Sequence, residues 1–118
     1  MSETPNDRKM VIALGSQTMG GPDERLGLAL MANFCRLLGE RDLGRIGAVV
    51  LYNEAVKLVV AGCPVLPHLQ SLAAREVPII LCRTCVEYFG LEDQLEVGRL
   101  GDMWEIQGLL LEHTVVRP

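Results

Sequence analysis

Three short, almost uninterrupted runs of apolar residues constrain the fold more than any other feature of this sequence. They are KMVIALG (9–15), RIGAVVLY (45–52) and VPIILC (77–82). None of them alternates apolar with polar residues, as a strand with one solvent-facing side would. A strand that is apolar on both sides is buried on both sides, which is typical of a parallel sheet covered by helices.

The segments between these runs have helical patterns. Helices are predicted over 22–39, 54–62, 63–76, 83–90 and 102–112, and two further strands over 95–101 and 113–118. Pro22 and Pro64 suit helix starts, and Asn53 and Asp102 are predicted helix caps. The predicted inward-facing stripe of the first helix consists of Leu26, Leu30, Phe34, Leu37 and Leu38.

Strands that alternate with helices predict an α/β fold with a mainly parallel sheet between helical layers. Right-handed crossovers place the loops that follow the strands at one edge of the sheet, where open α/β proteins bind ligands. We therefore expect three loops, 16–21, 53–57 and 82–85, to meet at this edge.

The composition of the 118-residue chain fits one globular domain, with 49% hydrophobic and 22% charged residues. We expect a flexible tail at 1–8 and a single domain at 9–118. Nucleic-acid binding is not expected, because the net charge is −4 and basic residues never occur more than two in a row. Aromatic residues, which would stack on bases, make up only 4% of the chain. The polar start of the chain and the lack of a long apolar segment predict no signal peptide, no membrane contact and a cytoplasmic location.

Cys82 and Cys85 form a C-x-x-C motif where the third predicted strand meets a predicted helix. The start of a helix favours a thiolate over a thiol, so this position favours reactive sulfur. Both residues would otherwise be small, buried packing residues. Zinc requires about four ligands, and the remaining candidates are isolated from one another, so we expect neither a metal nor a cofactor. These candidates are Cys35, Cys63, His68 and His113.

Other side chains of the same edge are candidates for substrate binding. Lys57 is either a cation that holds an anionic sulfur or substrate near Cys82, or a side chain paired with Glu54. The remaining candidates are polar, small or flexible residues of the three loops: Ser16, Thr18, Met19, Gly20, Asn53, Arg83 and Thr84.

Four segments in this order, GSQTMGGPDERLG, LYNEAVKLVVAG, LCRTCVEYFGL and VGRLGDMWEI, resemble the DsrE/DsrF-like sulfurtransferase family. The resemblance covers residues 10–118 and is closest to the YedF branch, the sulfurtransferase-like selenium metabolism proteins. It implies a three-layer α/β/α fold, a five-stranded sheet in the order 4-3-2-1-5, and assembly into trimers or hexamers. It also implies that Cys82 carries sulfur and that Cys85 is its partner cysteine.

The leading hypothesis is a sulfur-relay protein that accepts sulfane sulfur as a persulfide on Cys82. Members of the YedF branch carry an N-terminal TusA-like domain, which we expect this chain to lack, so a separate donor or TusA-like carrier would supply the sulfur. The alternatives are a dithiol–disulfide oxidoreductase or redox sensor that uses Cys82 and Cys85, and a non-catalytic, anion-binding assembly domain. Apolar helices also predict a homo-oligomer, with Trp104 near a subunit contact.

Overall fold

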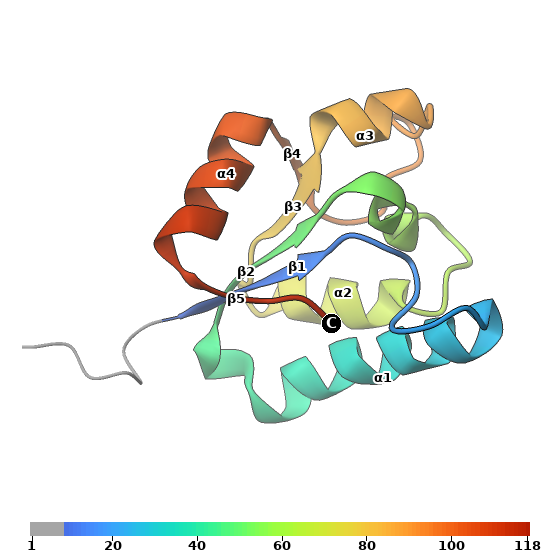
Figure 1. The fold of residues 1–118 in the computed structure, drawn as a ribbon, viewed down its shortest axis with the longest axis horizontal. Coiled ribbons are helices and arrows are strands. Elements are labelled where there is room, and N and C mark those ends of the chain that lie inside the picture. The colour runs from blue at the N-terminus through green and yellow to red at the C-terminus, as the bar shows by residue number, and fades with distance from the viewer. Residues whose placement is uncertain (1–8) are drawn as a thin grey trace, which may run out of the picture.

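The computed structural model describes residues 9–118, and the predicted tail at 1–8 lies outside the described residues. Five parallel strands form one sheet in the order β4-β3-β2-β1-β5. The predicted fold class and strand order are therefore confirmed (Figure 1). The strands are β1 (Met10–Leu14), β2 (Ile46–Leu51), β3 (Ile79–Cys82), β4 (Arg99–Gly101) and β5 (Thr114–Val116).

The three central strands are buried along almost their whole length. Every residue of β3 is buried, as are all residues of β1 and β2 except Met10 and Gly47. Such strands satisfy their backbone groups within the ladder and their side chains on both faces, so both faces must be covered. This requirement produces the three layers.

Helices cover the sheet on both sides. In Figure 1, α1 (Glu24–Arg41) and α2 (Leu66–Ala74) lie below the sheet, and α3 (Arg83–Tyr88) and α4 (Met103–Glu112) lie above it. The larger apolar cluster includes residues of α1 and α2, whereas the smaller one, which includes Ile106 of α4, has only six buried members. Within residues 9–118, no helix is both long and apolar enough to cross a bilayer.

The predicted inward-facing side of α1 is wrong along most of the helix, because the buried residues follow the predicted ones by one position. Leu26, Leu30 and Leu37 are exposed, whereas the buried residues are Gly27, Met31, Cys35, Leu38 and Gly39. The backbone before the helix sets this rotation, because a Cβ at Gly27 would lie 2.6 Å from Cβ of Thr18. Only glycine lets the preceding loop approach so closely, so Gly27 faces inward.

Several predicted helix starts also differ from the structure. The helix cap of α1 is Asp23, whose carboxylate accepts a hydrogen bond from the N–H of Leu26 at 2.8 Å, so Pro22 precedes the helix. Helix α2 begins at Leu66 and not at Pro64. The cap predicted for α4 is correct, because Asp102 accepts a hydrogen bond from the N–H of Glu105 at 2.9 Å.

The segment after β2 is not the predicted α-helix 54–62. It is a 3-10 helix, η3 (Asn53–Val59), and Val60 then forms an antiparallel bridge with Leu95. Asn53 does not cap it, because Asn53 itself has a left-handed backbone with φ of 53°. Two smaller differences are the short 3-10 helix η2 (Leu43–Arg45) before β2 and the length of β4, which spans three of the seven predicted residues.

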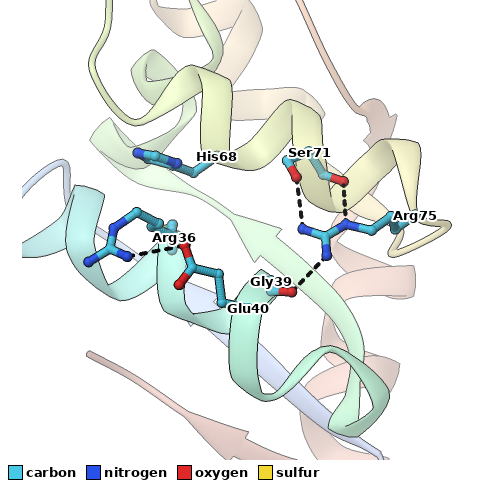
Figure 2. A pocket seen from close by; sticks show the side chains of 7 residues that line it. Arg36, Gly39, Glu40, His68, Ser71 and Arg75 are labelled. Atoms are coloured by element: carbon cyan, nitrogen blue, oxygen red, sulfur yellow. Dashed lines mark hydrogen bonds and ion pairs between the residues drawn. The ribbon is translucent and has the colours of Figure 1, made fainter.

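Arg75 ties α1 to α2 at the base of the molecule. Its guanidinium donates to the carbonyl of Gly39 at 2.7 Å, near the end of α1, and to Oγ of Ser71 at 2.8 Å within α2 (Figure 2). Gly39 permits this contact, since a Cβ there would lie 2.4 Å from Nη2 of Arg75. Arg36 and Arg75 both line a cavity between α1 and α2. Arg36, however, donates its hydrogen bond within α1, to the carboxylate of Glu40 at 3.1 Å.

We predict that Arg75→Met lowers the free energy of unfolding by about 1–2 kcal/mol, because it removes a charge-assisted hydrogen bond to a helix-end carbonyl. Arg36→Met is the matched control, and it should cost about 0.5 kcal/mol or less because its ion pair is exposed and within one helix. Urea denaturation followed by circular dichroism measures both. Equal losses for the two variants would contradict the role assigned to Arg75.

Candidate functional site

The two cysteines of the C-x-x-C motif lie where β3 passes directly into α3. Cys82 is the last residue of β3 and is 2% exposed, and Cys85 is a half-buried residue in the first turn of α3. Both are free thiols, and their side chains lie in the same apolar cluster above the sheet. One strand end therefore holds a buried thiol and a more accessible thiol next to each other.

The end of β2 supplies a hydrogen bond to this pair. The backbone N–H of Asn53 donates to Sγ of Cys85 at 3.0 Å. The left-handed backbone of Asn53 turns the chain at the end of β2, and asparagine tolerates this conformation better than most residues do. Asn53, a predicted binding residue, thus contacts the pair through its main chain.

The surroundings of Cys85 favour its protonated form. Burial, in the first place, and then hydrogen bonding with the Cys82 side chain raise the pKa of the Cys85 thiol above its usual value. The Asn53 N–H acts in the opposite direction, and the charge of Cys82 adds to the rise. The expected thiolate-favouring effect of the helix start is therefore outweighed at Cys85, because desolvation penalises the charged form. At neutral pH Cys85 is a thiol.

Three predicted binding residues, two of them between the cysteines in sequence, differ in their placement. Arg83 and Thr84 are exposed in the first turn of α3, between the two cysteines. The ammonium of Lys57 lies 4.3 Å from the ring centroid of Phe89, at the opposite end of α3. Lys57 thus makes a cation–π contact, and within residues 9–118 it forms no ion pair with Glu54.

The loop after β1 surrounds a different cavity. Ser16, Thr18 and Gly20 line a pocket of about 450 Å³, together with Tyr52 and Arg117. Met19 packs against the main core, and its N–H donates to the carbonyl of Gly27 at 3.0 Å. Tyr52 and Arg117 were not predicted as site residues from the sequence. Tyr52 directly follows β2, and Arg117 directly follows β5, at the same edge of the sheet.

The isolated cysteines and histidines lie elsewhere. Cys35 is a buried core residue, and burial first, then the charge of Cys63, raises its pKa to about 12. His68 is half-buried and lines the cavity between α1 and α2 (Figure 2). Nδ1 of His113 lies 3.0 Å from the carbonyl oxygen of Leu109.

Solved structures share this fold. The ychN protein from E. coli superposes with a TM-score of 0.72 at 21% identity, over 94% of this chain and 99% of that one. MTH1491 from Methanobacterium thermoautotrophicum has a TM-score of 0.64 at 18% identity, over 95% of this chain and 100% of that one. BT1422 from Bacteroides thetaiotaomicron has a TM-score of 0.65 at 14% identity, over 98% and 100%.

The chain therefore has the same fold as these proteins, with the strand order that the resemblance to the DsrE/DsrF-like family implies. No family model matches the sequence, and no curated protein is significantly similar to it. MTH1491 and BT1422 are described as proteins of unknown function, so the likeness extends to the fold and not to an activity. The geometry establishes this shared fold and a third strand that ends in the free Cys82.

We predict that Cys82→Ser speeds alkylation of Cys85 at neutral pH. The substitution removes two of the causes that raise the pKa of Cys85, so a larger fraction of that thiol ionises at any pH below its pKa. Iodoacetamide rates at Cys85, followed by peptide mass spectrometry from pH 6 to 10, should show a midpoint shifted to lower pH. Cys63→Ser is the control and should leave the midpoint unchanged; an unshifted midpoint in Cys82→Ser would refute the coupling.

Proposed function

We propose that this chain is a sulfur-relay protein that carries sulfane sulfur as a persulfide on Cys82. The observation that supports the proposal most is the position of two adjacent free thiols at the end of β3 in a DsrE-like fold. The C-x-x-C followed by an aromatic residue and Gly90 supports placing the chain in the YedF-like branch.

The transfer needs no cofactor and no external oxidant. The thiolate of Cys82 attacks the outer sulfur of a donor persulfide, a new S–S bond forms, and the donor leaves as a thiolate. The proton of Cys82 passes to the leaving group or to water. An acceptor thiolate then attacks the outer sulfur in the same way and regenerates Cys82, so atoms and electrons balance in both steps.

Burial gives the two thiols different roles. At 2% exposure, a persulfide on Cys82 would be shielded from water and from further oxidation. Cys85 is more accessible, and its raised pKa keeps a proton next to the bound sulfur. A donor reaches Cys82 when the first turn of α3 moves, and a six-residue helix has little intrinsic stability to oppose this motion.

The donor in this proposal is a separate persulfide protein, such as a TusA-like carrier, in the cytoplasm. The exposed segment Arg83–Thr84 beside the buried sulfur is where such a partner would dock. Whether the transferred element is sulfur or selenium is decided by the donor, since the same attack on an outer chalcogen atom serves both.

We predict that incubation with a persulfide donor adds the mass of one sulfur atom to the protein, and that Cys82→Ser abolishes the adduct. Intact-mass spectrometry before and after reduction measures it. Cys35→Ser and Cys63→Ser are matched controls, since they remove free thiols outside the motif and should retain the adduct. An adduct that survives Cys82→Ser would rule out this assignment.

The proximity of the two thiols also favours a second candidate, a dithiol–disulfide oxidoreductase or redox sensor. In that reaction an external oxidant takes two electrons and two protons, and Cys82 and Cys85 form a disulfide. Mild oxidation with glutathione disulfide distinguishes the candidates, because a relay protein need not close this bond whereas an oxidoreductase must. Alkylation-based mass mapping of the oxidised protein provides the readout.

We further propose that the chain forms a homo-oligomer through the outer face of α4. Of the ten residues of α4, only Ile106 is fully buried, whereas Trp104 is 81% and Leu111 is 78% exposed. These two side chains and Gly108 line a depression of about 370 Å³. Exposed apolar surface of this kind is rare on a monomer, and neighbouring copies of this chain in a closed symmetric ring would cover it.

Light scattering coupled to size exclusion should therefore give a trimer or hexamer for the wild-type chain, and a smaller species for Trp104→Glu. Leu26→Glu is the control, because Leu26 is also exposed, at 59%, but lies on α1, below the sheet. A wild-type mass near 13.0 kDa at micromolar concentration would refute the proposal. Dissociation by Leu26→Glu alone would move the interface to α1.

A further inference from the structure

A second cavity opens at the carboxyl edge of the sheet, away from the cysteines. It has a volume of about 450 Å³, and its wall comes from the end of β1, the loop after β1, Tyr52 after β2, and Arg117 after β5. A volume of this size is in the range of small-molecule sites. None of its lining residues is Cys82 or Cys85.

The topology of the sheet explains why a cavity lies here. The chain leaves β1 through α1 toward β2, and it reaches β5, on the other side of β1, through α4. Helices α1 and α4 lie on opposite sides of the sheet (Figure 1), but only the connection after β1 leaves from the carboxyl edge, because α4 joins β5 at its amino end. The strand order reverses between β1 and β5, and ligands of open α/β proteins bind beyond the carboxyl ends of the strands at such a point.

The polar groups of the cavity are suited to an anion. Within residues 9–118, the guanidinium of Arg117 forms no hydrogen bond and no ion pair. The hydroxyls of Ser16 and Thr18 lie 3.2 Å apart, and Oγ of Ser16 also accepts the N–H of Thr18 at 3.1 Å. One of the two hydroxyl protons is used in this contact, so the pair holds one free hydroxyl donor on the wall that includes Arg117.

The rest of the wall is apolar. Ala13 and Leu14 of β1 and Met31 of α1 are buried core residues that also border the cavity. The ring of Tyr52 closes one side against Gly15, where a Cβ would lie 2.9 Å from Cε1 of the ring. A bare inorganic ion would leave this apolar wall without a contact.

We propose that this cavity binds a small organic anion, whose charged head lies at Arg117 and the Ser16 and Thr18 hydroxyls and whose apolar body packs against the partly exposed ring of Tyr52. An aromatic or aliphatic phosphate ester or carboxylate has this chemistry. The proposal is independent of sulfur transfer. Tyr52 nevertheless borders both the cavity and the apolar cluster of the cysteines, and it directly precedes Asn53, whose N–H contacts Cys85.

Phenyl phosphate is the probe that tests the site, with phenol and inorganic phosphate as its two halves. Titration of the ¹⁵N-labelled full chain, followed by amide shifts in NMR spectra at constant ionic strength, should show saturable changes at Leu14, Ser16, Thr18 and Arg117. We expect a dissociation constant on the order of 1 mM and binding at least about tenfold weaker for either half alone, because each half makes only part of the contacts.

Arg117→Gln should weaken phenyl phosphate binding by about tenfold or more, since it removes the charged donor. Arg41→Gln is the matched control, because it changes the net charge equally at an exposed position in the last turn of α1, and it should leave the affinity unchanged. The Cys82→Ser/Cys85→Ser double variant should still bind, which separates this site from the sulfur relay. Any one of three results would overturn the proposal. The first is the absence of saturable shifts at 10 mM phenyl phosphate, and the second is equal affinity of Arg117→Gln and the wild type. The third is binding of phenol as tight as that of phenyl phosphate.

Discussion

The structure depends on the burial of three adjacent parallel strands on both of their faces. Because β1, β2 and β3 expose almost nothing to solvent, helices must cover the sheet above and below, and every connection must cross from one end of the sheet to the other. This arrangement places all strand ends of one kind at a single edge. The polar residues that follow the strands gather there, so the chemistry of the molecule is located by the packing of its core.

The same burial makes the two cysteines unequal. The ladder between β3 and β4 pairs Cys82 with Gly101, and Cys82 therefore belongs to the sheet and to the apolar cluster above it. Cys85 lies one helical turn further on, outside the ladder and only half-buried. The chain enters α3 without an intervening loop, so this offset in burial is fixed by the backbone. Because the C-x-x-C motif spans the end of a buried strand, the sulfur of Cys82 is shielded from solvent and that of Cys85 is more accessible.

The strands, their parallel arrangement and the position of the C-x-x-C could be predicted because each rests on a local and strong pattern. IILC is apolar without a break, and it forms β3 with every residue buried. The inward face of α1 could not be predicted, since apolar residues occur on most sides of that helix and the deciding contact is between Gly27 and Thr18, nine residues apart. Similarly, the sequence NEAVKLV has a helical pattern, but the left-handed Asn53 and the bridge between Val60 and Leu95 impose a 3-10 helix.

Met19 packs against the core and Lys57 lies against Phe89, but the other candidate binding residues divide into two groups for a reason that the linear sequence does not contain. Loops that follow strands share one edge, but their separation along that edge depends on the order of the strands, and β2 lies between β1 and β3. The loop after β1 therefore faces β5 and Arg117, whereas the end of β3 faces β2 and Asn53. Tyr52, directly after the intervening strand, lines the cavity and also packs in the apolar cluster that contains Cys82. A single set of substrate-binding residues inferred from sequence is thus, in three dimensions, a thiol pair and a separate cavity that share one aromatic wall.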